Sequence, residues 1–526
     1  MSRRLLKSTA VVGTNTLLSR VLGLVRDIII ARLFGAEAGT DAFFVAFKIP
    51  NFFRRLFAEG AFSQAFVPVL TETKTKQGEA EVQELVARTS GTLGGILFLV
   101  TLLGILAAPV FITLFAPGFV GDEGKFELSV AMLRLTFPYL LFISLTALAG
   151  GVLNSYGRFA GPAFTPVFLN ICLIAAAIWL APMFPEGLQV TALAWGVLLA
   201  GLVQLLFQFP FLLRLRMLRW PRWGWRFEGV RKIMRLMLPA IVGTSVVQIN
   251  LLIDTIIASF LITGSVTWLY YADRMVEFPL GVFGIALATV VLPSLSKKHA
   301  SDDPEDFSHT LDWALRLALT IGLPAALGLG LLAVPILASL FGYEAFGSND
   351  VSMAALALMA YAIGLPAFIL VKILASGYYA RQDTKTPVRI AIIAMITNIV
   401  LNLVFVVPMV KYDVTGPHAG LALATGLAAW LNALLLYRGL RKRAVYQPAK
   451  GWGRLFFGVF IGLVLMTLSL AWLLPVGGNW LTQAWQERAT QLGLLVSVAA
   501  AVYLGWLWLS GTFKQLARPT RHPDTL

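Results

Sequence analysis

Long apolar runs dominate the chain and are separated by short polar segments. A helix that crosses the hydrocarbon core of a membrane needs about 20 mostly apolar residues. Runs of this kind predict an all-α polytopic membrane protein with fourteen transmembrane helices, the second and eighth of which contain charges and prolines. The predicted spans are residues 9–34, 41–70, 89–115, 130–156, 160–184, 190–213, 233–261, 266–296, 311–341, 351–379, 387–410, 419–437, 455–474 and 492–509.

Basic residues alternate from loop to loop along this pattern. The N-terminus, the even-numbered loops and the C-terminal tail hold nearly all of them, whereas the odd-numbered loops hold only Lys125, Lys411 and Arg488. Basic residues collect on the cytoplasmic side of a membrane. The alternation therefore predicts that both termini are cytoplasmic, and it would fail if one span were added or removed in the middle of the chain.

The composition agrees with a membrane protein. Of 526 residues, 58% are hydrophobic and 13% are charged, against about 25% charged in soluble proteins. The net charge of +15 comes largely from the cytoplasmic loops, so we expect no nucleic-acid partner. The N-terminus resembles the start of a signal peptide, but Arg20 and Arg26 interrupt its apolar region, which predicts a retained first helix. A single cysteine, Cys172, excludes a disulfide framework.

An internal repeat with an offset of 227 residues divides the chain. The segment 27–31 matches 254–258, and Thr40 matches Thr267. Because the offset contains six spans, an even number, both halves have the same orientation, which predicts a parallel repeat. The linker mixes tryptophans with arginines, a composition typical of an interfacial segment on anionic lipid. The predicted domains are an N-terminal lobe at 1–215, the linker at 216–232, a C-terminal lobe at 233–440, and two last helices with a tail at 441–526.

Charged residues inside the first spans predict an anion-binding cavity. An ionisable group within a spanning helix costs at least a few kcal/mol and persists when it lines a polar cavity or is paired. On a helical wheel, Arg20, Arg26 and Asp27 lie in one polar sector of the first helix. Arg54 and Arg55 add two positive charges from the second. Guanidinium groups bind phosphate oxygens bidentately, so several of them together suit a diphosphate.

The second predicted helix contains a charged face. Asp41, Lys48, Arg55 and Glu59 share this face, although Pro50 can reset the helical phase. A broken helix that lines a cavity is a recurring feature of transporters. Internal ion pairing is the alternative interpretation of these charges.

The eighth predicted helix repeats this pattern with Asp273, Arg274 and Glu277. Arg274 could face the arginines of the first lobe across a cleft. The sequence gives no list of which acidic residue pairs with which arginine.

A weaker pattern suggests a cation site. Asp254 on the seventh helix, Asn398 and Asn402 on the eleventh, and Thr425 on the twelfth could supply oxygen ligands to Na⁺. Hydrogen bonding between helices is the alternative. The sequence contains no phosphate-binding loop, so we expect no use of ATP, and no catalytic set of side chains is suggested.

Several motifs resemble the MurJ (MviN) lipid II flippase family. They are the segments 20–27, 40–43, 47–51, 54–68, 270–274, 277–279 and 381–387. The resemblance covers essentially the whole chain. It implies the fold of the multidrug/oligosaccharidyl-lipid/polysaccharide exporter superfamily. It also implies movement of the lipid-linked peptidoglycan precursor from the inner to the outer leaflet of the bacterial cytoplasmic membrane.

The resemblance also implies roles for individual residues. The essential cavity arginines of the family match Arg20, Arg26, Arg54 and Arg274, and its important acidic positions match Asp41 and Glu59. The last two helices are implied to form a groove for the polyprenyl tail. Some members bind Na⁺ on the seventh, eleventh and twelfth helices, where Asn402 replaces a second carboxylate.

The leading hypothesis is a lipid II flippase that works by alternating access and is driven by a membrane potential or an ion gradient. The expected partners are lipid II, membrane lipids and cell-wall synthesis proteins. One alternative is an exporter of another polyprenyl-diphosphate-linked oligosaccharide or of a drug, and another is a membrane scaffold for cell-wall enzymes. An intramembrane enzyme is the least favoured. The residues expected to gate the two sides through ion pairs are Asp27, Asp41, Lys48, Arg55, Glu59, Asp273 and Glu277.

Overall fold

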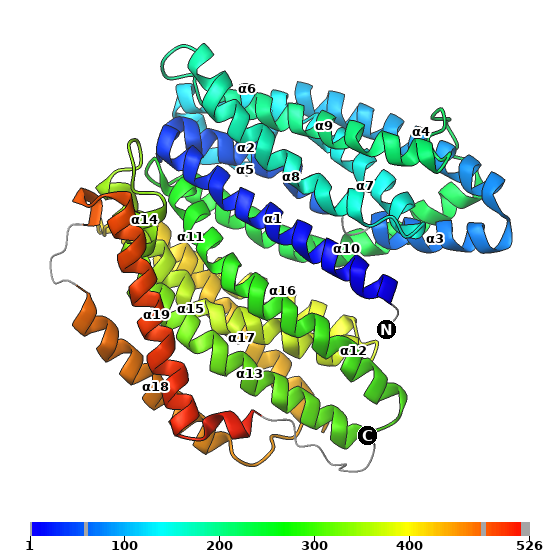
Figure 1. Cartoon of the computed structure of the whole chain (residues 1–526). Helices are drawn as coiled ribbons and strands as arrows, with labels where there is room; N and C mark the ends of the chain where they lie inside the picture. The colour runs from blue at the N-terminus through cyan, green and yellow to red at the C-terminus, as the bar shows by residue number, and fades with distance from the viewer. Residues whose placement is uncertain (1–2, 57–61, 475–479, 517–526) are drawn as a thin grey trace. The chain divides into compact units, whose positions relative to one another are not determined.

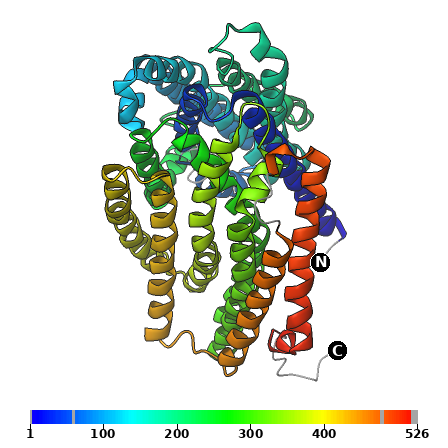
Figure 2. The ribbon, with the colours of Figure 1, turned by 90° about the vertical axis from the view of Figure 1, so that its left-hand side faces the viewer.

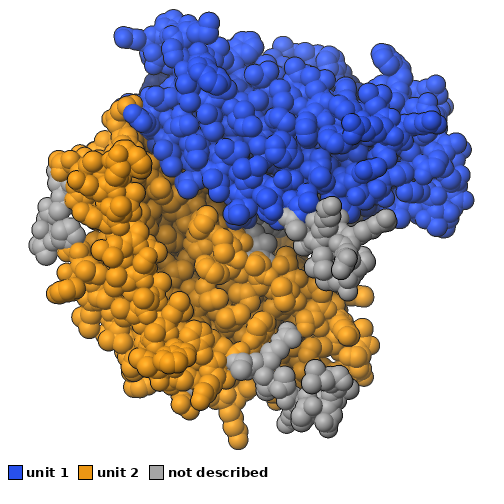
Figure 3. All heavy atoms as spheres, viewed as in Figure 1, with its two compact units in different colours: residues 1–267 blue, residues 268–526 orange. Residues whose placement is uncertain are grey.

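The computed structural model describes residues 3–56, 62–474 and 480–516. These residues form helices joined by turns and loops, without a β-strand among them. The chain divides into two compact units, residues 1–267 and 268–526, which are coloured separately in Figure 3.

Unit 1 is a bundle of helices that includes the charged N-terminal helix. α1 has 32 residues, which corresponds to a length of about 48 Å, and it packs along α8 (Figure 1). The elements of unit 1 are α1 (Arg3–Phe34), α2 (Ala38–Arg54), α3 (Ser63–Lys76), α4 (Glu79–Leu106), α5 (Ala108–Phe115), η2 (Pro117–Gly121), α6 (Glu123–Thr136), α7 (Tyr139–Ser155), α8 (Ala160–Ala175), η3 (Ala176–Leu180), η4 (Ala181–Met183), α9 (Thr191–Arg214) and α10 (Glu228–Ser259).

The last helix of this unit, α10, packs against α3. Ile233 and Met237 of α10 belong to the same buried cluster as Phe66, Leu85 and Val152. The packing units therefore divide after residue 267, whereas the predicted linker lies at 216–232. The predicted lobes at 1–215 and 233–440 remain a prediction.

Unit 2 begins within α11 and contains the remaining helices. Asp303 precedes α13, and its side chain accepts a hydrogen bond from the backbone N–H of Asp306 (2.9 Å) and so caps the first turn of the helix. The elements are α11 (Ser265–Pro279), η5 (Leu280–Ile285), α12 (Ala286–Ala300), α13 (Pro304–Leu331), α14 (Ala333–Leu340), α15 (Ser348–Tyr379), α16 (Lys385–Lys411), α17 (His418–Lys442), α18 (Trp452–Leu473), η6 (Trp480–Thr482), α19 (Trp485–Leu509) and η7 (Thr512–Gln515).

Small residues bring α15 and α17 close together. A Cβ atom added at Gly364 would lie 2.6 Å from the Cα atom of Gly426, so these two backbones meet without side chains between them. Trp430 of α17 also donates a hydrogen bond from Nε1 to the carbonyl oxygen of Ile363 (2.9 Å). α17 is therefore fixed against α15 while its other side packs against α16.

The last two long helices, α18 and α19, lie side by side (Figures 1 and 2). Near the start of α18, the buried carboxylate of Asp312 accepts hydrogen bonds from Tyr446 Oη (2.7 Å) and Trp452 Nε1 (2.8 Å). At the start of α19, buried Arg488 donates to the carbonyl oxygens of Ala338 (2.9 Å) and Gly342 (2.7 Å). The pair is thus attached to the rest of unit 2 near both of its ends.

Eleven helical segments among the described residues are long and apolar enough to cross a membrane, judged by length and composition. The all-helical polytopic prediction is therefore confirmed, and the protein is a multi-pass membrane protein. α1, α2, α3 and α10 are not among the eleven. The segments are Glu79–Leu106, Glu123–Ser155, Ala160–Met183, Thr191–Arg214, Ser265–Ala300, Pro304–Leu331, Ser348–Tyr379, Lys385–Lys411, His418–Lys442, Trp452–Leu473 and Trp485–Leu509.

Candidate functional site

Arg26 and Asp27 form a buried ion pair on α1. Only 4% of Arg26 and 2% of Asp27 is exposed. Arg26 Nε and Nη2 both donate hydrogen bonds to Asp27 Oδ1, at 2.9 and 2.6 Å. A buried guanidinium is tolerated when its charge is paired and its N–H groups are bonded. The arrangement therefore compensates the positive charge of Arg26 inside unit 1.

Asn170 of α8 completes this cluster. Its Oδ1 accepts a hydrogen bond from Arg26 Nη1 (3.1 Å), and its Nδ2 donates to the carbonyl oxygen of Ser19 (2.9 Å). Asn170 is itself 5% exposed. The amide thus orients Arg26 and joins α8 to α1, a role that was not predicted from the sequence.

The other predicted arginines of unit 1 lie in more open positions. Arg20 is exposed and has no hydrogen bond or ion pair to another described residue. Arg54, at the end of α2, is half-buried and donates from Nε to Asn51 Oδ1 (3.0 Å). Arg55 is exposed. Glu59 lies outside the described residues.

Asp41 forms an extensive polar network in unit 1. The residue is 1% exposed and lies in the first turn of α2. Its carboxylate accepts hydrogen bonds from Lys125 Nζ (2.9 Å), the Gly264 N–H (2.8 Å), the Thr267 N–H (3.0 Å) and Thr267 Oγ1 (2.7 Å). Hydrogen bonds to a charged group are the stronger kind, at about 1.5–3 kcal/mol each.

Two of these donors are backbone N–H groups at the start of α11. The N-terminus of a helix leaves such groups without an intrahelical partner and attracts negative charge. Asp41 therefore caps α11 from a distant part of the chain, while buried Lys125 balances its charge. The network joins the beginnings of α2 and α11, and all four of its hydrogen bonds depend on the Asp41 carboxylate.

Within unit 2, Arg274 of α11 is half-buried and pairs with Glu277 (Nη1 to Oε2, 2.9 Å). Its guanidinium also lies 5.5 Å from the centre of the Tyr270 ring. Asp273 is exposed, and Lys48 of α2, in unit 1, is half-buried. The convergence of Arg274 with Arg20, Arg26 and Arg54 remains a prediction.

Three of the four residues predicted to bind a cation lie together on α16 and α17. Asn398 and Asn402 are buried, and Thr425 Oγ1 lies 3.5 Å from Asn398 Oδ1. Asp254 lies on α10 of unit 1 and is half-buried. Amide and hydroxyl oxygens are ligands that hard cations accept, but the carboxylate belongs to the other unit. The Na⁺ site therefore also remains a prediction.

Solved structures with a similar fold belong to membrane transporters. A MATE family transporter of the MOP superfamily, in an inward-facing conformation, is 17% identical with a TM-score of 0.61 over 83% of this chain and 98% of that chain. At this identity the similarity shows the fold alone. The fold and the buried charges together define the class, which is a polytopic membrane protein built like a transporter.

The particular family follows from closer matches. A family model described as "Lipid II flippase MurJ" matches residues 30–488. A probable lipid II flippase MurJ of Vibrio cholerae is 49% identical over 97% of both chains. The lipid II flippase MurJ of Burkholderia cenocepacia is 45% identical over 96% of this chain and 98% of its own. The chain belongs to the MurJ lipid II flippase family.

A solved member of the family supports the fold at full length. A structure described as "Lipid II flippase MurJ, inward closed conformation" is 28% identical with a TM-score of 0.79, over 96% of this chain and 99% of that chain. The resemblance inferred from the motifs is thus confirmed.

Proposed function

We propose that this protein is a flippase that moves lipid II from the inner to the outer leaflet of the bacterial cytoplasmic membrane by alternating access. The observation that carries the proposal is the similarity, over 97% of both chains, to a relative named as a probable lipid II flippase. The diphosphate and the sugar-peptide head occupy a hydrated cavity, and the polyprenyl tail stays in lipid beside the last two helices. The protein acts as a transporter without catalytic chemistry.

In this proposal, Arg20, Arg26, Arg54 and Arg274 bind the diphosphate. Arg20 and Arg26 are six residues apart on α1, a rise of about 9 Å, so both can reach one elongated anion. The exposure of Arg20 supports a role in first contact. The buried pair of Arg26 with Asp27 supports a second step, in which phosphate oxygens replace the Asp27 carboxylate.

The gate on the extracytoplasmic side is proposed to be the Asp41 network. Opening this side separates α2 from the start of α11, and the four hydrogen bonds to Asp41 resist that movement. Asp27, Lys48, Arg55, Glu59, Asp273 and Glu277 are the further gating residues of the proposal.

We also propose fourteen spans with both termini in the cytoplasm. The three spans beyond the eleven apolar segments are α1, α2 together with α3, and α10. These spans are less hydrophobic because they contain the polar residues to which we assign a function. α2 and α11 begin 227 residues apart, at Ala38 and Ser265. This spacing equals the repeat offset in the sequence and supports two six-helix lobes.

The linker between the lobes is proposed to lie on anionic lipid at the cytoplasmic surface. Trp220, Trp223 and Trp225 are 86%, 58% and 49% exposed, Arg222 lies between the first two, and Arg219 and Arg226 flank the three. Transport of lipid II is driven by the membrane potential. Moving one elementary charge across 100 mV provides about 2.3 kcal/mol. Na⁺ coupling through Asp254, Asn398, Asn402 and Thr425, and contact with cell-wall synthesis proteins, are secondary parts of the proposal.

Complementation of a strain depleted of its own lipid II flippase tests this function. The wild-type gene should restore growth, whereas Arg26→Ala and Arg26→Lys should fail at normal membrane levels, because lysine lacks the bidentate geometry of arginine. Arg32→Ala is the matched control, since Arg32 is an exposed arginine at the end of the same helix. Growth of the Arg26→Ala strain, or failure of the wild type together with export of a drug, would contradict the proposal.

A further inference from the structure

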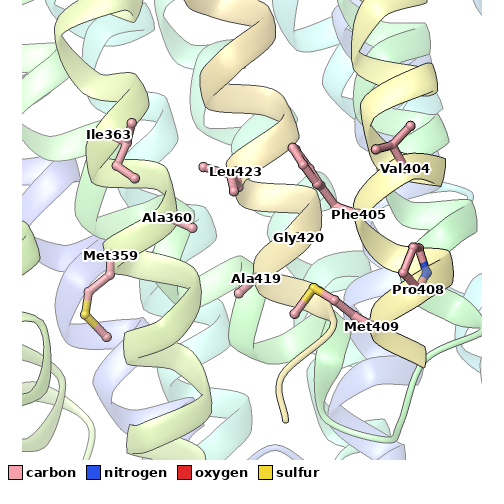
Figure 4. Close-up of a pocket in the computed structure, with 10 residues that line it drawn as sticks. All are labelled: Met359, Ala360, Ile363, Val404, Phe405, Pro408, Met409, Ala419, Gly420 and Leu423. Atoms are coloured by element: carbon pink, nitrogen blue, oxygen red, sulfur yellow. The ribbon is translucent and has the colours of Figure 1, made fainter. Parts of the chain in front are cut away.

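An apolar groove lies between α15 and α16, with α17 as its floor (Figure 4). Its volume is about 470 Å³, within the range of about 300–1,000 Å³ that small-molecule sites occupy. Ile363 of α15, Phe405 of α16 and Leu423 of α17 contribute to the wall, together with Met359 and Met409. All of the lining residues are apolar, so the groove suits a hydrocarbon chain and its lining residues offer no polar side chain to a hydrophilic ligand.

The groove continues an exposed apolar face of α16. Ile396, Val400, Leu403 and Val407 are each more than half exposed. α16 is among the segments that can cross a membrane, and the exposed apolar face of a spanning helix contacts hydrocarbon. Acyl chains of the bilayer therefore have direct access to the groove. The two methionines in its wall are flexible and adapt to a chain with many conformations.

A single positive charge lies at the end of the groove. Val404, Pro408 and Lys411 follow i, i+4, i+7 spacing, so Lys411 lies one turn beyond the groove on the same face of α16. Its side chain is exposed, and Nζ lies 5.8 Å from the centre of the Tyr412 ring, which is itself 73% exposed. Lysine and tyrosine at the end of a span mark the level of the lipid headgroups.

Lys411 also differs from the other basic residues of the odd-numbered loops. Lys125 is buried against Asp41, and Arg488 is buried against backbone carbonyl groups. Lys411 is the exposed member of this set and forms no ion pair with any residue in the described part of the chain. The first two basic residues thus stabilise the fold, and the third is available to a ligand.

We propose that the groove binds one acyl chain of an anionic phospholipid whose phosphate contacts Lys411. With the orientation proposed above, this lipid belongs to the outer leaflet. The phosphate meets the ammonium group at the headgroup level, and the acyl chain below it enters the groove. Binding is separate from the flipping reaction, because none of the proposed substrate or gating residues lines the groove.

Photolabelling of the full-length protein in lipid nanodiscs tests the site. The probes are phosphatidylglycerol and phosphatidylethanolamine with the same acyl chains and a diazirine on one chain, and the labelled peptides are mapped by mass spectrometry. Phosphatidylglycerol should label the groove segments 359–363, 404–409 and 419–423 in preference to phosphatidylethanolamine. Lys411→Gln should lower this labelling about fivefold, which corresponds to about 1 kcal/mol for one basic residue at an anionic surface.

The control variants separate the groove from general lipid contact. Lys385→Gln removes the same charge from the opposite end of α16 and should leave groove labelling unchanged, and Lys411→Arg should retain it. Ala419→Leu fills the groove and should lower labelling by both lipids, whereas Val400→Leu, outside the groove, should not. Equal labelling along the whole exposed face of α16, no effect of Lys411→Gln, or cross-links to a second copy of the chain would overturn the proposal.

Discussion

Two charged residues of the first two helices, Arg26 and Asp41, are held by specific partners in the structure. Arg26 is bonded to Asp27 and Asn170, and Asp41 is bonded to Lys125 and to Thr267 at the start of α11. Each network is buried, so removing one member leaves the others without compensation. Such losses cost about 1–3 kcal/mol for a neutral partner and about 3–5 kcal/mol for a buried charge.

Asn170→Ala should lower both the stability and the activity of the protein. The substitution leaves one guanidinium N–H of Arg26 and the Ser19 carbonyl without their bonds to the amide, and we expect a loss of about 1–3 kcal/mol. Thermal unfolding in detergent and lipid II flipping are the two measurements. Ile171→Ala is the matched control because Ile171 is a neighbouring exposed residue of α8. Equal behaviour of the two variants would exclude the role assigned to Asn170.

Asp41→Asn should loosen the start of α11. An asparagine keeps the size of the side chain but loses the charge that binds Lys125 and the two backbone N–H groups. Hydrogen exchange at Gly264 and Thr267 should rise about tenfold or more, since one charged hydrogen bond contributes about 1.5 kcal/mol or more. Glu37→Gln removes a neighbouring exposed carboxylate without a side-chain cap bond and should change nothing at α11. Unchanged hydrogen exchange at Gly264 and Thr267 in the Asp41→Asn variant would contradict the proposal that the Asp41 network forms the gate.

The sequence could indicate which residues are charged within the spans but not which partners they have. Arg26 and Asn170 are 144 residues apart, Asp41 and Lys125 are 84 apart, and Asp41 and Thr267 are 226 apart. Helical periodicity reaches only a few turns along one helix, so it carries no information on these contacts. For Lys125 the sequence contains one indication of a specific role, because this residue is a rare basic residue in an otherwise acidic loop. For Asn170 the only indication is that it is a polar residue in an apolar run.

At the scale of elements, the hydrophobic pattern placed apolar runs where the structure has helices but could not locate every break within them. The predicted run 130–156 divides into α6 and α7 near Pro138, and the run 89–115 divides into α4 and α5 at Ala107, shortly before Pro109. Proline lacks the N–H group that continues the helical ladder. One proline barely changes the mean hydropathy of a long apolar run. A prediction from hydropathy therefore does not locate these breaks.

The packing of α10 is a second feature that the pattern could not reveal. Its core residues Ile233 and Met237 are ordinary apolar residues, and the choice of α3 as a partner depends on shape. Hydrophobic residues specify that a face is buried but not which neighbour covers it.

The loop before α16 supports a prediction on pH. Asp383 accepts hydrogen bonds from the Thr386 N–H (2.9 Å) and Oγ1 (2.7 Å) and from Arg443 Nη1 (2.7 Å). Burial alone would raise the pKa of Asp383, but these hydrogen bonds lower it to about 2. The pKa in an unfolded chain is about 3.9. The stabilisation is therefore complete above about pH 4 and is lost as the pH falls through about 2.

Asp383→Ala should lower the free energy of unfolding by about 1 kcal/mol, the usual contribution of a side chain that caps a helix. Asp383→Asn keeps an acceptor for Thr386 and should cost less. Thermal unfolding midpoints in detergent at pH 7 and at pH 3 measure the effect. An equal midpoint for the wild type and Asp383→Ala at pH 7 would show that the contact does not stabilise the loop.

At the scale of the whole molecule, we propose a transporter that moves a diphosphate-linked lipid past a set of arginines, of which Arg26 is buried. Membership of the MurJ family, the polytopic helical fold and the transporter-like architecture are shown by the structure and its similarity to known proteins. Motifs along the chain, most of them between residues 20 and 68, allowed the family to be predicted. Patterns of single residues indicate which faces of a helix are buried but not which neighbours cover them, so they do not encode a transport cycle.

The most direct test is a leaflet-specific assay of lipid II accessibility in cells depleted of other flippases, run with and without a membrane potential. With the wild-type protein, lipid II should become accessible from outside, and collapse of the potential should prevent it. Arg26→Ala, at equal membrane levels, should leave lipid II in the inner leaflet, while Arg32→Ala should behave as the wild type. Normal exposure of lipid II by the Arg26→Ala protein would contradict the central claim.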